Sequence, residues 1–186
     1  MQTAADKGQR YTYADYCAWD GSQRWELIDG AAYAMSPGPS WKHQMIVGNL
    51  YFQLAGFLQG KPCMAFVAPL DVRLNAEDGD DTVVQPDILV ICDRSKLSGT
   101  CCVGAPDMVV EILSPSTASN DMFLKYSKYL QAGVREYWIA DPETKTVRAF
   151  ILKDGKYDSV DYFGSGAVPV HVLEGCEIDL TRVFDF

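Results

Sequence analysis

The sequence lacks the long apolar run of a membrane protein. No window of its 186 residues comes near the roughly 18 uninterrupted apolar residues that a membrane-spanning helix needs. The first residues, MQTAADKGQRYTY, contain no apolar run after Lys7 and therefore do not resemble a secretory signal. We expect a cytoplasmic protein that makes no contact with a membrane.

Cysteine pairs with the C-x-x-C spacing of metal sites are also missing. The six cysteines are scattered without a C-x-x-C pair, and most lie in apolar segments, where a free cysteine acts as a small hydrophobic residue. We therefore expect neither a disulfide nor a zinc site. Histidine is scarce as well, and neither of the two histidines stands near Ser114 or Ser116 in the sequence, which argues against serine catalysis.

Basic residues are too few to attract a polyanion to the molecule as a whole. Sixteen Lys and Arg stand against 25 Asp and Glu, which gives a net charge of −9. Proteins that bind nucleic acid tightly and without sequence preference are usually basic. The charge therefore counts against a DNA enzyme unless a local patch, a bound divalent metal or a cleft lined by two subunits supplies the attraction.

The chain does contain enough apolar residues for one substantial core. Hydrophobic residues make up 48% and aromatic residues 12% of the sequence, and domains of this size are commonly single. We expect one domain over residues 1–186, with a short β-rich tail at its end. No internal repeat, low-complexity tract or linker interrupts the chain.

Hydrophobic periodicity predicts an alternation of helices and strands. Thr12 is placed to cap a short helix, and Asp29-Gly30 is a strong turn signal between two strands. Two longer helices are predicted over 40–60 and 121–132, the second ending at Gly133. The strands expected are WELI, AAYAM, CMAFVAPLDVRL as one long strand, TVVQPDILVICD, DMVVEIL and the pair in EYWIADPETKTVRAFIL. We interpret RSKLSGTCCVGAP as a loop that has room for one helical turn. This order predicts an α/β (α+β) fold with a central mixed sheet flanked by helices.

Two carboxylates stand in these apolar strands, Asp87 in QPDILVI and Glu111 in MVVEILS. A carboxylate at a mostly buried strand position is costly unless it is paired, hydrogen-bonded or bound to metal. If the two strands are neighbours, the acids can converge on one hard cation, Mg²⁺ or Mn²⁺, with the backbone carbonyl of Ile112 as a further oxygen ligand. The alternative for Asp87, which follows Pro86, is a solvated acid at a strand edge.

A lysine follows on the next predicted helix. At 3.6 residues per turn, Lys125 lies at the edge of the buried face and Lys128 lies farther toward solvent, which makes Lys125 the better candidate for a catalytic amine. Asp121, four residues earlier, either forms an ordinary helix pair, orients the amine or complements the helix dipole. The predicted buried face consists of Met122, Phe123, Tyr126, Tyr129 and Leu130.

Several ordered motifs together resemble a known family. They are WELIDG, MSPGPSWKH, QPDILV, GAPDMVVEILSPST, ND-x-x-x-K and GVREYWIADP, over roughly residues 10–155. This succession is similar to the Uma-type family of bacterial endonucleases, a branch of the PD-(D/E)XK restriction-endonuclease-like superfamily. The resemblance implies a restriction-endonuclease-like sheet with flanking helices, DNA as the substrate, and a divalent-metal site formed by Asp87 and Glu111.

The chain departs from the superfamily pattern at one position. The usual lysine stands two residues after the second acid, where this chain has Leu113. The resemblance implies that the lysine has moved to the following helix, at Lys125. Glu26 and His43 also match motifs of the family: Glu26 as an outer metal contact, and His43 as a contact to phosphate or to a carboxylate. His43 lies equally on the apolar face of its helix, where a histidine is commonly part of the core.

The leading hypothesis is therefore a metal-dependent endonuclease that acts on DNA as a homodimer. One alternative is a non-catalytic homo-oligomeric or protein-binding module that keeps the nuclease fold, favoured by the acidic composition and by Leu113. Another is a metal-dependent hydrolase of smaller phosphoesters, which suits the negative charge better than long DNA does. The aromatic residues Trp19, Trp41 and Tyr162 either line a dimer interface or complete the core.

Overall fold

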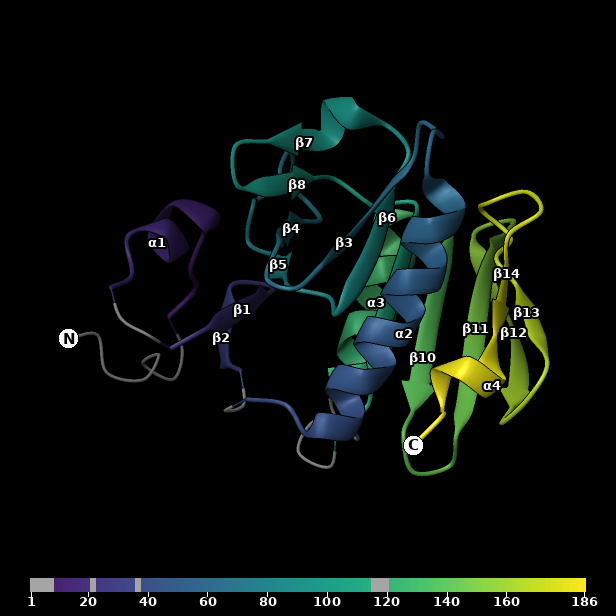
Figure 1. Ribbon diagram of the computed structural model, residues 1–186. Coiled ribbons are helices and arrows are strands. Elements are labelled where there is room, and N and C mark those ends of the chain that lie inside the picture. The colour runs from purple at the N-terminus through teal and green to yellow at the C-terminus, as the bar shows by residue number, and fades with distance from the viewer. Residues whose placement is uncertain (1–8, 21–22, 36–37, 115–120) are drawn as a thin grey trace.

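The computed structural model describes residues 9–20, 23–35, 38–114 and 121–186 (Figure 1). Its helices are α1 (Tyr13–Cys17), α2 (Trp41–Leu58), α3 (Asp121–Ala132) and α4 (Leu180–Val183), with a 3₁₀ turn η1 (Arg94–Lys96). Its strands are β1 (Trp25–Ile28), β2 (Ala31–Ala34), β3 (Met64–Val67), β4 (Asp71–Arg73), β5 (Val83–Val84), β6 (Ile88–Ile91), β7 (Leu97–Ser98), β8 (Cys101–Val103), β9 (Met108–Ile112), β10 (Glu136–Asp141), β11 (Thr146–Lys153), β12 (Lys156–Phe163), β13 (Ala167–Pro169) and β14 (Glu177–Asp179). No helix among the described residues is long and apolar enough to cross a bilayer.

The strands form one large mixed sheet and one smaller sheet. The large sheet has the order β12-β11-β10-β9-β6-β3, in which β9 and β10 run parallel and the other neighbours antiparallel. The smaller sheet has the order β2-β1-β5-β4-β8-β7. Helix α2 covers one face of the large sheet and α3 the other, as Figure 1 shows. The predicted fold class, a mixed sheet flanked by helices, is confirmed.

Local signals in the sequence place the first elements correctly. Thr12 caps α1, and Ser40 caps α2 by accepting a hydrogen bond from the His43 amide at 3.2 Å. Asp29 and Gly30 have φ angles of 51° and 73°, as the tight turn between β1 and β2 requires. The side chains of α2 that pack against the sheet recur at helical spacing; they are His43, Ile46, Leu50, Leu54 and Leu58.

Three predictions about the strands are wrong. The expected strand TVVQPDILVICD divides at Pro86 into β5 of the smaller sheet and β6 of the large sheet. The segment CMAFVAPLDVRL is two strands in two different sheets, β3 and β4, because Pro69 between them has no N–H to continue a ladder. The segment RSKLSGTCCVGAP is more than a loop, because it contains β7 and β8. Strand β8 pairs in parallel with β4, so its partner lies far away in the sequence and leaves no local period to detect.

The expectation that the chain has no disulfide is also wrong. Cys63 and Cys92 are bonded to each other across 29 residues of sequence. Met64 pairs with Ile91 at the end of the antiparallel β3–β6 ladder, so the next position out on each strand is a cysteine. Only the register of these strands brings the two thiols together, which is why cysteine spacing alone gives no sign of the bond.

A buried acid in β10 predicts how stability depends on pH. Glu136 is fully buried; its Oε1 accepts from Trp138 Nε1 at 2.7 Å and its Oε2 from the Val172 amide at 2.9 Å. Burial raises the pKa of Glu136, although these hydrogen bonds and His171 oppose the shift. The protonated Glu136 therefore contributes to stability. This contribution is complete below the unfolded-state pKa of about 4.3, and it is lost as the pH rises through the higher pKa of the folded state.

Glu136→Gln removes this titration. We expect the free energy of unfolding in urea to fall less for the variant than for the wild type between pH 4 and pH 8. The exposed Glu177→Gln is the control and should keep the wild-type slope. Equal slopes for wild type and Glu136→Gln would show that the carboxyl group is charged over the whole range.

Candidate functional site

Asp87 lies where β6 begins, beside the end of β9. Strands β6 and β9 are antiparallel neighbours, and their ladder ends at the pair of Ile88 with Val110. The Oδ2 atom of Asp87 accepts a hydrogen bond from the Ile112 amide at 2.8 Å and lies 3.2 Å from His43 Nε2. The side chain of Asp87 is thus fixed by one group from β9 and one from α2.

Glu111 projects from β9 toward α3. Its Oε1 accepts from Lys125 Nζ at 3.1 Å and from the Tyr129 hydroxyl at 2.6 Å. Lys125 is only 8% exposed and also donates to Glu26 Oε1 at 2.8 Å. Lys128 instead pairs with Asp29 at 2.6 Å, away from this group. The structure therefore brings Lys125, rather than Lys128, to Glu26 and Glu111.

The predicted orientation of α3 is correct for Tyr129 and wrong for Phe123. Tyr129 is completely buried, whereas Phe123 is 77% exposed. The helix turns Lys125 inward between Glu26 and Glu111, and this rotation carries Phe123, two residues earlier, out toward solvent. The structure describes Asp121 and Met122 only as part of helix α3 and not their side chains, and Ser116 lies outside the described residues.

Glu26 is held on β1 by a group that the sequence did not suggest. Its Oε1 accepts from the Gln85 amide at 2.8 Å as well as from Lys125. Gln85 directly precedes Pro86-Asp87, so the short segment that positions Asp87 also positions Glu26. The side chain of Gln85 is anchored in turn by hydrogen bonds with Arg24, Tyr16 and Asp71.

Burial and charge act in opposite directions in this cluster. Burial, reinforced by the nearby carboxylates of Asp87 and Glu26, raises the pKa of Glu111 to about 7, while Lys125 and the Tyr129 hydroxyl lower it. Burial alone would lower the pKa of Lys125, but Glu111 and Glu26 outweigh that effect and raise the pKa above its ordinary value. Lys125 is therefore a cation at neutral pH, paired with the carboxyl groups of Glu111 and Glu26.

The oxygen atoms of this cluster suit a hard divalent cation. Lys125 and Tyr129 both donate to Oε1 of Glu111, so that Oε2 is the atom on which a cation would bind. The Leu113 amide donates to the Ala140 carbonyl of β10. Because backbone groups alternate in direction along a strand, the amide and the carbonyl of Ile112 face away from β10, on the side where the amide donates to Asp87. Asp87, Glu111 and the Ile112 carbonyl are therefore the oxygen donors that a cation bound here would use.

Side chains alone would not complete the coordination of a metal here. In the part of the chain that the structure describes, no three His, Cys, Asp or Glu side chains are grouped to hold a metal ion. Mg²⁺ commonly binds through one or two carboxylates and fills its remaining positions with water and substrate phosphate. Two acids and one carbonyl therefore fit Mg²⁺ or Mn²⁺ and do not fit a closed zinc site.

Comparison with known proteins places the chain in a family. The solved structure of a "putative nuclease" from Anabaena variabilis superposes with a TM-score of 0.77 at 19% identity, over 94% of this chain and 98% of that one, which shows a shared fold. An uncharacterized protein of Synechocystis sp. is 32% identical over 118 residues, which span 62% of this chain and 60% of that protein. The model of the Uma2 family, described as "Putative restriction endonuclease", matches residues 12–181. The chain therefore belongs to the Uma2 family and has the restriction-endonuclease-like fold.

Proposed function

We propose that this protein is an endonuclease that hydrolyses phosphodiester bonds of DNA with Mg²⁺ or Mn²⁺. The observation that supports this most directly is the position of Lys125. Its Nζ lies 3.1 Å from Glu111 Oε1 although the two residues stand 14 apart in the sequence. The amine from α3 thus reaches the second acid, which a lysine at position 113 would do in the usual superfamily pattern.

Each side chain of the cluster has a role in this proposal. Asp87, Glu111 and the Ile112 carbonyl would hold the metal, which when bound supplies an acidic water and neutralises charge on the phosphate. Lys125 orients the attacking water and offsets the negative charge that develops on the phosphoryl oxygens. His43 fixes Asp87, while Glu26 is a second carboxylate that fixes Lys125 beside Glu111.

Tyr129 is an addition to the residues that the sequence suggested. Its hydroxyl, completely buried, donates to Glu111 Oε1 at 2.6 Å and favours the ionised carboxylate. Since Tyr129 stands one helical turn after Lys125, both side chains reach the same oxygen from α3. Tyr129 therefore positions Glu111 without touching the substrate.

Metal binding separates this proposal from a non-catalytic module. Calorimetric titration with Mn²⁺ should show binding to the wild type, and Asp87→Asn should weaken it by about 10-fold or more, because a hard cation loses a charged oxygen ligand. Asp161→Asn, which removes an exposed acid paired with Arg148, is the matched control and should bind as the wild type does. A module without catalytic function has no reason to bind metal at Asp87, so an absence of heat or an unaltered Asp87→Asn titration would support that alternative.

The net charge of −9 keeps a smaller phosphoester open as the substrate. Long DNA meets the repulsion of the whole acidic molecule, whereas a small phosphodiester meets mainly the local site. Cleavage of oligonucleotides should exceed that of small phosphodiesters if DNA is the substrate, and the reverse order would favour a phosphoesterase.

A further inference from the structure

The outward face of α2 exposes large apolar side chains. Trp41 is 64%, Met45 42% and Phe52 76% exposed, on the side of the helix opposite the residues packed against the sheet. Figure 1 shows α2 on the outside of the molecule, in front of the large sheet. Of the aromatic residues considered for a dimer interface, Trp19 and Tyr162 pack against hydrophobic clusters, whereas Trp41 touches the Phe186 ring edge to face and keeps most of its surface exposed.

These side chains follow the spacing of a helix–helix contact. Steps of four and three residues alternate along Trp41, Met45, Gly48, Phe52 and Ala55, which we call the outer seam. Alternating steps of this kind place a continuous stripe on one side of a helix, as in coiled coils. Helix α2 therefore has two contact faces, of which the sheet covers one.

The charge of this region favours a protein partner over nucleic acid. No Asp or Glu occurs from residue 30 to residue 70, although the chain contains 25 of them. The one Lys or Arg of α2 is Lys42, which pairs with Glu143 at 3.3 Å, so the outer seam offers no cation to a phosphate. In a molecule of net charge −9, the carboxylate-free helix α2 is where two copies can approach with little repulsion, and the carboxylates beside it, Glu143 and Asp185, belong to other segments.

We propose that the outer seam binds the same seam of a second copy, with the two α2 helices antiparallel and the two-fold axis at Gly48. This register sets Gly48 against Gly48, where the backbones can come close. It also sets Trp41, the largest side chain, level with Ala55 of the second copy, and it brings Met45 to within one residue of the level of Phe52, which lies on the same stripe. The large and small residues thus complement each other when the seam meets itself, as a two-fold interface requires.

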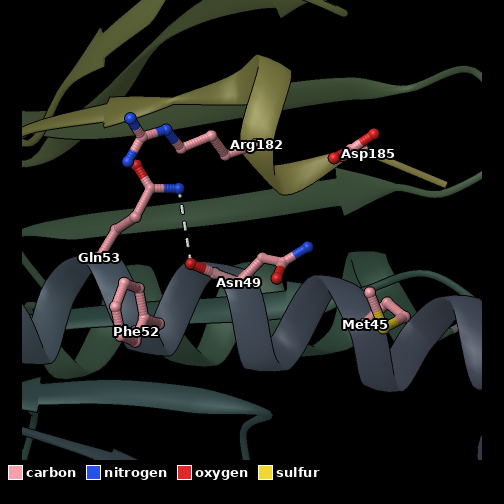
Figure 2. A pocket seen from close by; sticks show the side chains of 6 residues that line it. All are labelled: Met45, Asn49, Phe52, Gln53, Arg182 and Asp185. Carbon is pink, nitrogen blue, oxygen red and sulfur yellow. Dashed lines mark hydrogen bonds between the residues drawn. The ribbon is translucent and has the colours of Figure 1, made fainter.

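The surface beside the seam supports the same arrangement. Figure 2 shows Met45 and Phe52 on α2 next to Arg182 and Asp185 of the C-terminal segment. Together with Asn49 and Gln53, these residues line a cavity of about 230 Å³ along the seam. Arg182, which pairs with Asp179 at 3.4 Å, and Asp185 lie on the same C-terminal segment, so a two-fold axis at the seam can bring Arg182 of one copy to Asp185 of the other.

Gly48 offers a test that spares the fold. A Cβ atom placed on Gly48 would meet nothing within 4 Å, and arginine is a better helix former than glycine. In sedimentation equilibrium we expect the wild type to be a dimer and Gly48→Arg to associate about 100-fold more weakly or not at all, since an unpaired charge would be buried at the axis. Its thermal unfolding should stay at or above that of a monomeric reference, Phe52→Glu.

The control places the same charge on another exposed apolar residue. Val160 is 46% exposed on the edge strand β12, so Val160→Arg should leave the dimer intact. A wild type that stays monomeric at high micromolar concentration would overturn the proposal. So would a dimer that survives Gly48→Arg and is lost in Val160→Arg, which would place the contact at β12.

The register has its own test. Met45→Lys and Phe52→Glu should each weaken the homodimer, and an equimolar mixture of the two should form a heterodimer, because the antiparallel register pairs the new lysine with the new glutamate. A parallel pair would face Met45 with Met45, so mixing would relieve the like charges without forming a lysine–glutamate pair, and the wild type would then be a better partner for Met45→Lys than Phe52→Glu is. Absence of the heterodimer, with both homodimers weakened, would therefore rule out the antiparallel register. These tests do not depend on the proposed chemistry.

Discussion

Glu111→Gln is expected to lower the rate of DNA cleavage by about 10³-fold or more. The substitution keeps the shape of the side chain and an oxygen for Lys125 and Tyr129 but removes the charge on which the cation would bind. Loss of several kcal/mol of transition-state stabilisation corresponds to a factor of this size. Nicking of supercoiled plasmid DNA with Mg²⁺ or Mn²⁺ measures the effect, and Glu111→Ala should abolish cleavage.

The fold of Glu111→Gln should survive, which keeps the result interpretable. Because the pKa of Glu111 is raised to about 7, the neutral side chain of the variant resembles a form that the wild type already populates near neutral pH. We expect a cooperative unfolding transition as stable as that of the wild type, or more so above pH 7. Glu143→Gln, at an exposed acid, is the control for cleavage. Wild-type rates in Glu111→Gln would show that the metal is held elsewhere or that none is needed.

The sequence predicts the parts of this fold whose signals are local. Helix α2 follows from its apolar period and Ser40, and the β1–β2 turn follows from Asp29-Gly30. Strand β8 and the Cys63–Cys92 bond could not be found in this way. Each of them depends on which distant strand lies alongside, and that choice is made by packing of the whole molecule.

In the candidate site, too, the sequence predicts the residues with a local signal and misses those that depend on distant neighbours. Asp87 and Glu111 stand out because a carboxylate in an apolar strand needs a partner. The partner of Glu26 is less visible, because Gln85 holds that acid with its backbone amide, a group that every residue except proline has. Tyr129 was expected in the core for its apolar ring, and only the orientation of α3 shows that its hydroxyl reaches Glu111.

Lys125→Met is expected to abolish cleavage and also to destabilise the protein by about 3–5 kcal/mol at neutral pH. The amine is the shared hydrogen-bond donor of Glu26 and Glu111, and all three side chains are largely shielded from water. Without it, two carboxyl groups would face each other with no cation between them, so that one must become protonated or the helix must move. Urea-induced unfolding measures the loss. Lys128→Met removes a pair with Asp29, which is 56% exposed, and should change stability by less than about 1 kcal/mol.

A double variant separates the structural role of Lys125 from its catalytic role. In Glu26→Gln, Lys125→Met only Glu111 keeps a buried carboxyl group, and much of the lost stability should return, since one acid without a like-charged neighbour costs less to bury than two. Cleavage should not return, because no cation then offsets charge on the phosphate. If cleavage recovers together with stability, the amine serves only to neutralise Glu26 and Glu111, and the catalytic role proposed for Lys125 is wrong. If stability recovers and cleavage stays absent, the lysine on α3 performs the task of the residue that Leu113 replaces.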